Sequence, residues 1–164
     1  LGGQHVLAVR YVQGYGTDQP EPFRLGGEET DLDLVDLLVP VHKAILGRRE
    51  FPLRGYDEGL PQLRGRRMQL ASIEYRFPIA LVERGLMAPP VGVIQWSGNL
   101  FADSGAAWNE GSSPDTYYTS VGVELDAELS LFYGRDLQAR LGVASGLDVQ
   151  IGDNRAYFSL GASF

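Results

Sequence analysis

Apolar and polar residues alternate along most of the chain. Between Arg67 and Ile79, apolar side chains occupy one parity, while Ser72, Glu74 and Arg76 occupy the other. The clearest alternation runs from Thr116 to Tyr133. A period of two is typical of β-strands. Similar runs occur at residues 5–13, 23–27, 93–105, 137–143 and 156–164. The pattern therefore predicts an all-β protein of about seven antiparallel strands connected up and down.

The lengths of these strands and of their connections narrow the fold class. The alternating runs reach roughly 12–18 residues, whereas globular strands usually have about 5–6, and a tilted strand needs about 9–11 to cross a bilayer. Connections near 14–22, 83–91 and 134–136 are short, and those at 28–65, 106–115 and 146–154 are longer. Outer-membrane barrels show this asymmetry. Alternation alone is equally compatible with a soluble sheet that has one solvated face.

The connection at 28–65 interrupts the alternating pattern. Its acidic residues precede its apolar ones, which predicts a short helix near residues 31–39. Farther on, Arg54, Gly55 and Tyr56 combine a fixed guanidinium, a freely turning backbone and a rigid ring with a polar tip. A connection this long and this apolar is typical of a functional loop rather than a disordered one.

Composition and the few reactive residues argue against several function classes. The net charge of −7 argues against a nucleic-acid partner. Cys is absent, and the two histidines, His5 and His42, have no spacing of a recognised metal site. The Asp103-Ser104-Gly105 sequence lacks the preceding glycine of a nucleophile elbow. We therefore expect neither catalysis nor a cofactor or metal.

Five motifs together resemble those of a known family. In chain order they are Phe23-Arg24-Leu25-Gly26-Gly27, Leu53-Arg54-Gly55-Tyr56, Ile73-Glu74-Tyr75-Arg76-Phe77-Pro78, Phe101-Ala102-Asp103-Ser104-Gly105-Ala106 and a terminal Phe164. The order and spacing resemble the bacterial surface antigen superfamily of outer-membrane barrels, which includes BamA, TamA and the two-partner secretion transporters. The resemblance covers residues 23–164.

The resemblance implies a fold, a location and a function. It implies a transmembrane, antiparallel up-and-down β-barrel of roughly sixteen strands, of which residues 1–164 would be the C-terminal part. The loop at about 28–65 would dock in the lumen. The barrel would lie in the bacterial outer membrane and take part in protein assembly, insertion or translocation without catalysis. Its partners would be membrane lipid, client polypeptides and upstream periplasmic domains of the same chain.

The resemblance also implies roles for individual residues. The loop tip of Arg54, Gly55 and Tyr56 would fold into the barrel, where Arg54 would meet Glu74 and Asp103. The alternation independently places both acids on the polar face. Arg76 shares that face with Glu74 and is an alternative partner for the acids. The C-terminal strand would carry the assembly signal, with residues Phe158, Leu160 and Phe164.

Two other interpretations remain open at this point. The same alternation suits a soluble β-sandwich or barrel that acts as a binding module. A small outer-membrane barrel hydrolase would need a Ser/His pair on the lipid face. His5 has the parity of Leu7 and Val9, but no partner serine is evident in the sequence.

Overall fold

The computed structural model describes residues 5–16, 21–27, 49–87, 90–131 and 135–162, and these residues form an all-β structure. Six strands are long: β1 (Val6–Tyr15), β5 (Arg67–Met87), β6 (Pro90–Trp108), β7 (Tyr118–Leu131), β8 (Arg135–Gly146) and β9 (Asn154–Ala162). Four elements are short: β2 (Phe23–Leu25), β3 (Glu50–Phe51), the 3-10 turn η1 (Pro61–Leu63) and β4 (Arg64–Gly65).

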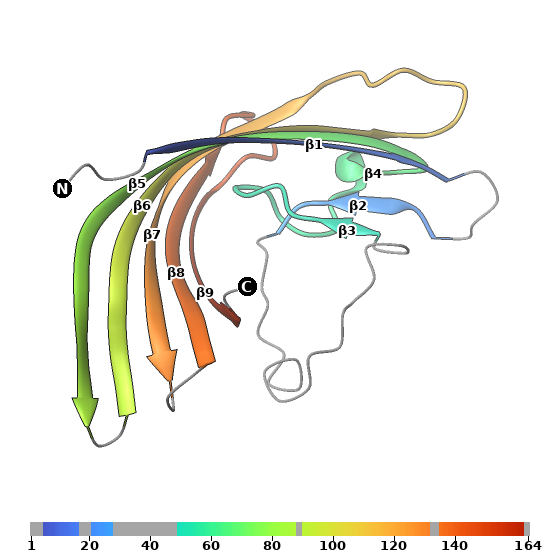
Figure 1. Ribbon diagram of the computed structural model, residues 1–164. Coiled ribbons are helices and arrows are strands. Elements are labelled where there is room, and N and C mark those ends of the chain that lie inside the picture. The colour runs from blue at the N-terminus through green and yellow to red at the C-terminus, as the bar shows by residue number, and fades with distance from the viewer. Residues whose placement is uncertain (1–4, 17–20, 28–48, 88–89, 132–134, 163–164) are drawn as a thin grey trace.

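The long strands form one antiparallel sheet in the order β1-β5-β6-β7-β8-β9. Neighbouring strands follow each other along the chain, apart from the segment between β1 and β5 (Figure 1). The sheet curves strongly and is not closed into a barrel, so β1 and β9 are its two edges. The expected long, antiparallel, up-and-down strands are therefore present, in a sheet that is open.

The short elements form a second, three-stranded sheet in the order β3-β2-β4, which lies on the concave side of the large sheet (Figure 1). The hydrophobic core lies between the two sheets. Its buried members are Phe23, Leu25, Leu53, Tyr56, Leu63, Met68 and Leu70. The long connection is thus anchored to the sheet by apolar burial, which is the main favourable contribution to folding.

The short strand at Phe23–Leu25 corrects the strand prediction. The alternation suggested a further strand of the large sheet, but this segment pairs with Glu50–Phe51 and Arg64–Gly65 instead. Both Phe23 and Leu25 are buried against the concave face. The connection at 14–22 therefore belongs to the end of the sheet that carries the long loops, and not to the short-turn end. The helix predicted near 31–39 lies outside the described residues.

The remaining connections follow the expected asymmetry. At one end β6 leads to β7 through residues 109–117 and β8 to β9 through residues 147–153. At the other end β5 ends at Met87 and β6 begins at Pro90, while β7 ends at Leu131 and β8 begins at Arg135. The strands continue farther than the sequence suggested, since β5 extends through Pro78 and Gly85 with register shifts between its pairs to β6.

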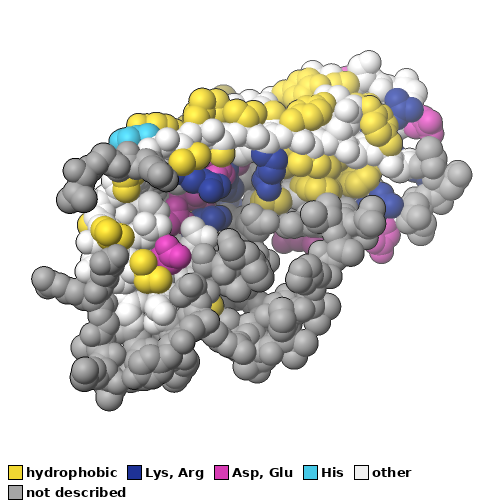
Figure 2. All heavy atoms as spheres, viewed as in Figure 1, with side chains coloured by type: hydrophobic (Ala, Val, Ile, Leu, Met, Phe, Trp, Pro, Cys, Tyr) yellow, Lys and Arg dark blue, Asp and Glu magenta, His cyan; other side chains and the backbone are white. Residues whose placement is uncertain are grey.

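The two faces of the large sheet differ sharply in chemistry. The convex face exposes large apolar side chains from strand after strand. These are Leu7, Val9, Ile73, Tyr75, Leu100, Val121, Val123, Leu125, Leu141, Val143 and Phe158. The concave face buries polar ones: Arg54 from the loop, and Ser72, Asn99, Asp103, Ser120, Glu124 and Asp126 from the wall. Figure 2 shows apolar side chains along the convex margin and charged ones gathered in the hollow beneath it.

Candidate functional site

The loop tip reaches the concave wall because the small sheet holds both sides of it. Residues 49–51 lie beside β2, where the Gly26 N–H donates to the Phe51 carbonyl at 3.1 Å. The Gly27 N–H donates to the Tyr56 carbonyl at 2.9 Å. Leu53, between these anchors, is fully buried in the core. Arg54 therefore follows a fixed backbone and points its side chain into the wall.

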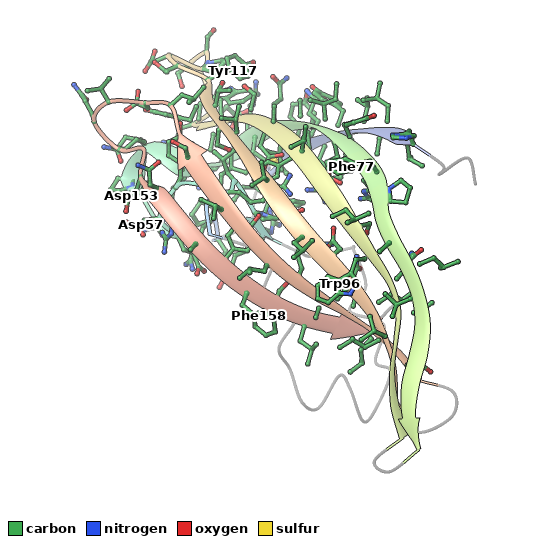
Figure 3. The ribbon with its side chains drawn as sticks, turned by 90° about the vertical axis from the view of Figure 1, so that its left-hand side faces the viewer. Asp57, Phe77, Trp96, Tyr117, Asp153 and Phe158 are labelled. Carbon is green, nitrogen blue, oxygen red and sulfur yellow. The ribbon has the colours of Figure 1, made fainter. Side chains whose placement is uncertain are left out.

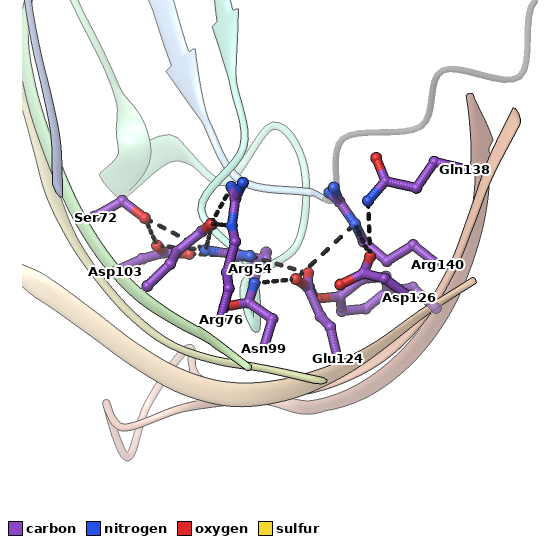
Figure 4. Close-up of polar contacts among 11 residues, drawn as sticks. Arg54, Ser72, Arg76, Asn99, Asp103, Glu124, Asp126, Gln138 and Arg140 are labelled. Atoms are coloured by element: carbon purple, nitrogen blue, oxygen red, sulfur yellow. Dashed lines mark hydrogen bonds and ion pairs between the residues drawn. The ribbon is translucent and has the colours of Figure 1, made fainter. Parts of the chain in front are cut away.

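Arg54 uses its whole guanidinium on acceptors of the wall (Figure 4). Its Nε and Nη2 donate to the two carboxylate oxygens of Asp103, at 2.7 and 2.8 Å. Its Nη1 donates to Glu124 at 2.9 Å, and Nη2 also donates to Glu74 at 3.1 Å. A paired, two-bond contact to one carboxylate combines charge attraction with fixed orientation. Arg54 thus bridges three strands, β5, β6 and β7.

The register of the sheet explains why these acceptors meet. Ser72 pairs directly with Asp103, and its hydroxyl donates to Asp103 Oδ1 at 2.5 Å. Glu74 is two residues from Ser72 on the same face, and Glu124 pairs with Asn99 of β6. Side chains of one face stand about 5 Å apart across strands. Three carboxylates at this spacing repel each other unless a cation lies between them.

An aromatic ring forms the floor beneath the guanidinium. The Arg54 guanidinium carbon lies 3.5 Å from the centre of the Phe101 ring. Phe101 in turn covers Gly122, its direct partner on β7, where a Cβ atom would clash with the ring. Cation–π attraction is strongest where water is excluded, and Phe101 is almost fully buried. Gly122 therefore makes room for the ring that supports Arg54.

A second set of side chains holds the carboxylates in place. The Asn99 amide donates to Glu124 at 2.6 Å, and the Tyr157 hydroxyl of β9 donates to the same carboxylate at 2.5 Å. Arg76 Nη2 donates to Glu74 at 2.6 Å. Nearby, Arg140 Nε donates to Asp126 at 3.0 Å. The network therefore continues through all five strands from β5 to β9.

The surroundings keep Arg54 charged. Burial alone would lower the pKa of its guanidinium, but the hydrogen bond to Asp103 and the charges of Asp103, Glu124 and Glu74 outweigh burial and raise it. An arginine so placed stays a cation at every physiological pH. Removing it would leave buried carboxylates without their main partner, which is far more costly than losing an exposed ion pair.

Beside Arg54, Gly55 and Tyr56 dock against the end of the β8–β9 hairpin. Gly55 has φ of +84°, a conformation that favours glycine. Tyr56 is fully buried, and its hydroxyl donates to the Thr119 carbonyl at 2.7 Å. Burial raises the pKa of this phenol, so it remains a donor. The Tyr56 ring also meets Tyr118 edge-on, with centres 5.8 Å apart.

The structure brings together the five loop-docking residues expected from the sequence. Arg54 contacts both Asp103 and Glu74, and Arg76 binds the second oxygen of Glu74 rather than replacing Arg54. Of the expected assembly-signal residues, Phe158 is exposed on the convex face and Leu160 is half-buried. Phe164 lies outside the described residues.

Sequence reasoning missed Glu124 as a direct partner of Arg54. It also missed the surrounding members of the network, which are Ser72, Asn99, Phe101, Asp126, Arg140 and Tyr157. Glu124 occupies a polar position in the alternation of β7, so the sequence already placed it on the polar face of the sheet. Its distance from Arg54 depends on the register between β6 and β7. Phe101 has an apolar side chain on the polar face, and this break in the alternation was a usable signal.

The site consists of ion pairs and hydrogen bonds between the loop and the wall of the sheet. Within the described residues, no group of three or more His, Cys, Asp or Glu side chains is placed to hold a metal ion. A polar cavity of about 160 Å³ lies beside the network, lined by Arg10, Arg54, Arg76, Arg140 and Tyr157 among others. On the opposite face, the His5 ring stacks on Tyr75 and shares a hydrogen bond of 2.8 Å with its hydroxyl.

No protein-family model, curated protein or solved structure matches the chain. Among the described residues, no helix has the length and apolar character needed to span a membrane. The distribution of side chains over the two faces and the docked loop are therefore the observations from which a function has to be argued.

Proposed function

We propose that this chain is part of an outer-membrane β-barrel of the bacterial surface antigen type, which assembles or translocates other polypeptides. Its long strands would cross the outer membrane, and its concave face would line the lumen. The segment between β1 and β5 would be a loop folded into that lumen and held there by Arg54. Assembly or translocation would proceed without catalysis and would depend on the strand edges and the docked loop.

The observation that carries the proposal is the distribution of polarity over the large sheet. A soluble protein buries its apolar side chains and rarely exposes a large continuous apolar surface. Here one row across all six long strands is apolar on the convex face: Leu7, Tyr75, Leu100, Val123, Val143 and Ala156. The charged groups lie on the other face, around Arg54. Lipid outside and a polar lumen inside would produce this arrangement.

The extent of the apolar surface agrees with a bilayer. Along β7 the outward apolar positions extend from Val121 to Leu129. The rise from Val121 to Leu129 is roughly 26 Å at about 3.3 Å per residue. A tilt of about 35–45° leaves roughly 19–22 Å across the membrane, comparable with the band of about 25 Å found on outer-membrane barrels. Toward the long-loop end, Tyr11, Tyr15 and Tyr117 lie beyond the band, where barrels carry aromatic girdles.

The edges of the sheet connect the fold to the proposed activity. An open sheet edge exposes unpaired N–H and C=O groups, which lipid cannot satisfy. The proposal therefore requires strand partners at β1 and β9, from other parts of a longer protein or from other chains. An edge that pairs reversibly can also receive a client strand by β-augmentation. This would be the insertase or translocase step.

A membrane test can use the absence of Cys, because every introduced cysteine is a single label. Val123→Cys reports the convex face, and Ser97→Cys reports the concave face of the neighbouring strand. Each variant is labelled with an environment-sensitive fluorophore in bacterial outer membranes. We expect nitroxide lipids to quench the label at residue 123 strongly and the label at residue 97 weakly.

Quenching of both labels by an aqueous quencher, with no effect of nitroxide lipids, would refute the membrane location and favour a soluble binding module. Cell fractionation and heat-modifiable gel mobility of the wild-type protein provide independent readouts. If the protein is in the membrane but its depletion leaves outer-membrane protein levels and polypeptide secretion unchanged, the barrel part of the proposal stands and the assembly or translocation part fails.

A further inference from the structure

The tip of the loop makes a second set of contacts that does not involve Arg54. The Asp153 N–H donates to the Gly55 carbonyl at 3.1 Å, and Tyr56 forms an isolated antiparallel bridge with Gly152. Both partners lie in the connection between β8 and β9 (Figure 3, where Asp57 and Asp153 lie close together). The loop tip thus pairs through its backbone with the end of the β8–β9 hairpin.

Tyr56 joins the same hairpin to β7. The Thr119 carbonyl accepts two hydrogen bonds, from the Tyr56 hydroxyl at 2.7 Å and from the Leu147 N–H at 2.9 Å. The Asp148 N–H in turn donates to the Tyr56 oxygen at 3.4 Å. One buried phenol therefore holds β7 and the β8–β9 connection at a fixed separation. Its removal would loosen both contacts at once.

Glycine makes this contact possible. A Cβ atom on Gly55 would lie 2.6 Å from the Gly146 nitrogen and 2.9 Å from the Ser145 carbonyl carbon. A Cβ atom on Gly146 would lie 2.7 Å from the Gly152 Cα and 3.1 Å from the Tyr56 ring. Three backbone segments therefore meet at a spacing that only glycine allows. Outside this contact, an ion pair between Asp57 and Arg155 connects the loop to the beginning of β9.

Within this hairpin β9 is the less attached strand. Among the described residues, β8 pairs with β7 along its whole length, whereas β9 pairs with β8 alone. Its main inward anchor is Tyr157, which donates to Glu124 and covers Gly142. Glu124 is itself a partner of Arg54. Beyond the pairing with β8, two contacts hold β9, one at the β8–β9 connection and one at Tyr157, and both therefore depend on the position of the loop tip.

We propose that the segment 54–57 is a latch that holds the β8–β9 hairpin in the sheet, so that undocking of the loop and release of the last strands are one coupled transition. Two sites are coupled when each biases the same two-state element. Here that element is the hairpin. As a regulator of the β9 edge the latch rests on the proposed function, whereas the coupling rests on these contacts alone.

The test uses two glycines of the same loop. Gly55 and Gly59 have nearly equal φ angles, +84° and +81°, but a Cβ atom on Gly59 would meet nothing within 4 Å. Gly55→Ala and Gly59→Ala therefore carry similar backbone strain, and only Gly55→Ala disturbs the latch. Amide hydrogen exchange of the full chain, in the detergent micelles or buffer that keeps it folded, reads every strand separately.

We expect Gly55→Ala to speed exchange by about tenfold or more both at 53–57 and across β8 and β9, and by less in β5 and β6, which pair with each other along their length. Gly59→Ala should leave β8 and β9 at the wild-type rate. Faster exchange in the loop with wild-type exchange in β8 and β9 would overturn the latch. So would equal acceleration by both variants, because strain alone would then explain the effect.

A milder variant protects the test against misfolding. Tyr56→Phe keeps the ring and removes only the hydroxyl, and we expect exchange in β8 and β9 to rise by about three- to tenfold, as for the loss of one hydrogen bond. Tyr117→Phe is the control, since its hydroxyl bonds Gln69 away from the latch. Unchanged exchange in β8 and β9 of Tyr56→Phe would refute the coupling. Because all variants share one solvent, this result is independent of whether the protein enters a membrane.

Discussion

The two faces of the large sheet are built from the same strands and differ in almost every other respect. Across the convex face, one row reads Leu7, Tyr75, Leu100, Val123, Val143 and Ala156. The adjacent concave row reads Val6, Arg76, Asn99, Glu124, Gly142 and Tyr157. The apolar row is exposed, whereas the concave row is buried at its centre, at Asn99, Glu124 and Gly142, and exposed at Val6 and Arg76.

This difference teaches that alternation alone does not identify which face meets water. A soluble sheet and a barrel wall share the period of two. In a soluble sheet the apolar face packs on the core, whereas in a barrel wall the apolar face meets lipid and the polar face lines the lumen. In this sheet the polar face is the buried one: Asp103 and Glu124 are buried, while Val123 and Leu141 are about half exposed. Matched substitutions on the two faces therefore test this difference directly.

The largest effect is expected for Arg54→Ala. Asp103 and Glu124 would stay buried without their main cation, and loss of one partner from a buried ion pair costs roughly 3–5 kcal/mol. Arg76→Ala is the matched change on the same face. Arg76 is exposed, so we expect about 0–1 kcal/mol. Unfolding free energies from denaturant titration in micelles compare the two, and equal values would show that Arg54 is not specially placed.

The next effect concerns the convex face. In a bilayer, Val123→Lys would put an ammonium group against lipid, which costs about 2–4 kcal/mol at the midplane and less toward the interfaces. Ser97→Lys places the same group on the concave face of the paired strand, where a wet lumen tolerates it. Refolding into lipid vesicles, followed by unfolding in denaturant, measures both. A small cost for Val123→Lys would contradict lipid contact at that position.

The long strands of the sheet and the face that carries its acidic residues could be predicted from the sequence. Alternation identified the long strands, and the parity of Glu74 and Asp103 placed both acids on one face. The resemblance of the motifs to those of a barrel family then implied that Arg54 meets these acids. The predictions of strands and faces succeeded because they depend on parity and on pairing between neighbouring strands, which short-range patterns encode. The contact of Arg54 came from the resemblance alone.

The rest required long-range information. Glu124 becomes a partner of Arg54 through the register between β6 and β7, which no local pattern fixes. Phe23–Leu25 looked like a strand of the large sheet because its alternation is too short to reveal its partner, and the structure pairs it with the loop instead. The contact of Gly55 with Gly146 joins segments that are far apart in the chain.

A smaller effect is expected where an aromatic ring covers a glycine. Phe101 lies over Gly122 on the concave face and Phe77 over Gly98 on the convex face, each as a direct cross-strand pair. Only Phe101 has a guanidinium on its ring. Phe101→Leu should therefore cost about 2 kcal/mol more than Phe77→Leu, the value of a desolvated cation–π contact. Equal losses of unfolding free energy would assign the whole role of Phe101 to glycine packing.

The smallest effect is expected for Tyr157→Phe, which removes one donor from Glu124 and leaves the ring over Gly142. A hydrogen bond to a charged acceptor contributes about 1.5–3 kcal/mol, but Glu124 keeps its bonds from Arg54 and Asn99. We therefore expect the loss to lie near or below the low end of this range. Tyr75→Phe on the exposed face removes a hydroxyl that bonds His5, and should change the unfolding free energy little. If Tyr157→Phe and Tyr75→Phe lower the unfolding free energy equally, the concave network does not extend to β9, and its contribution ends at β8.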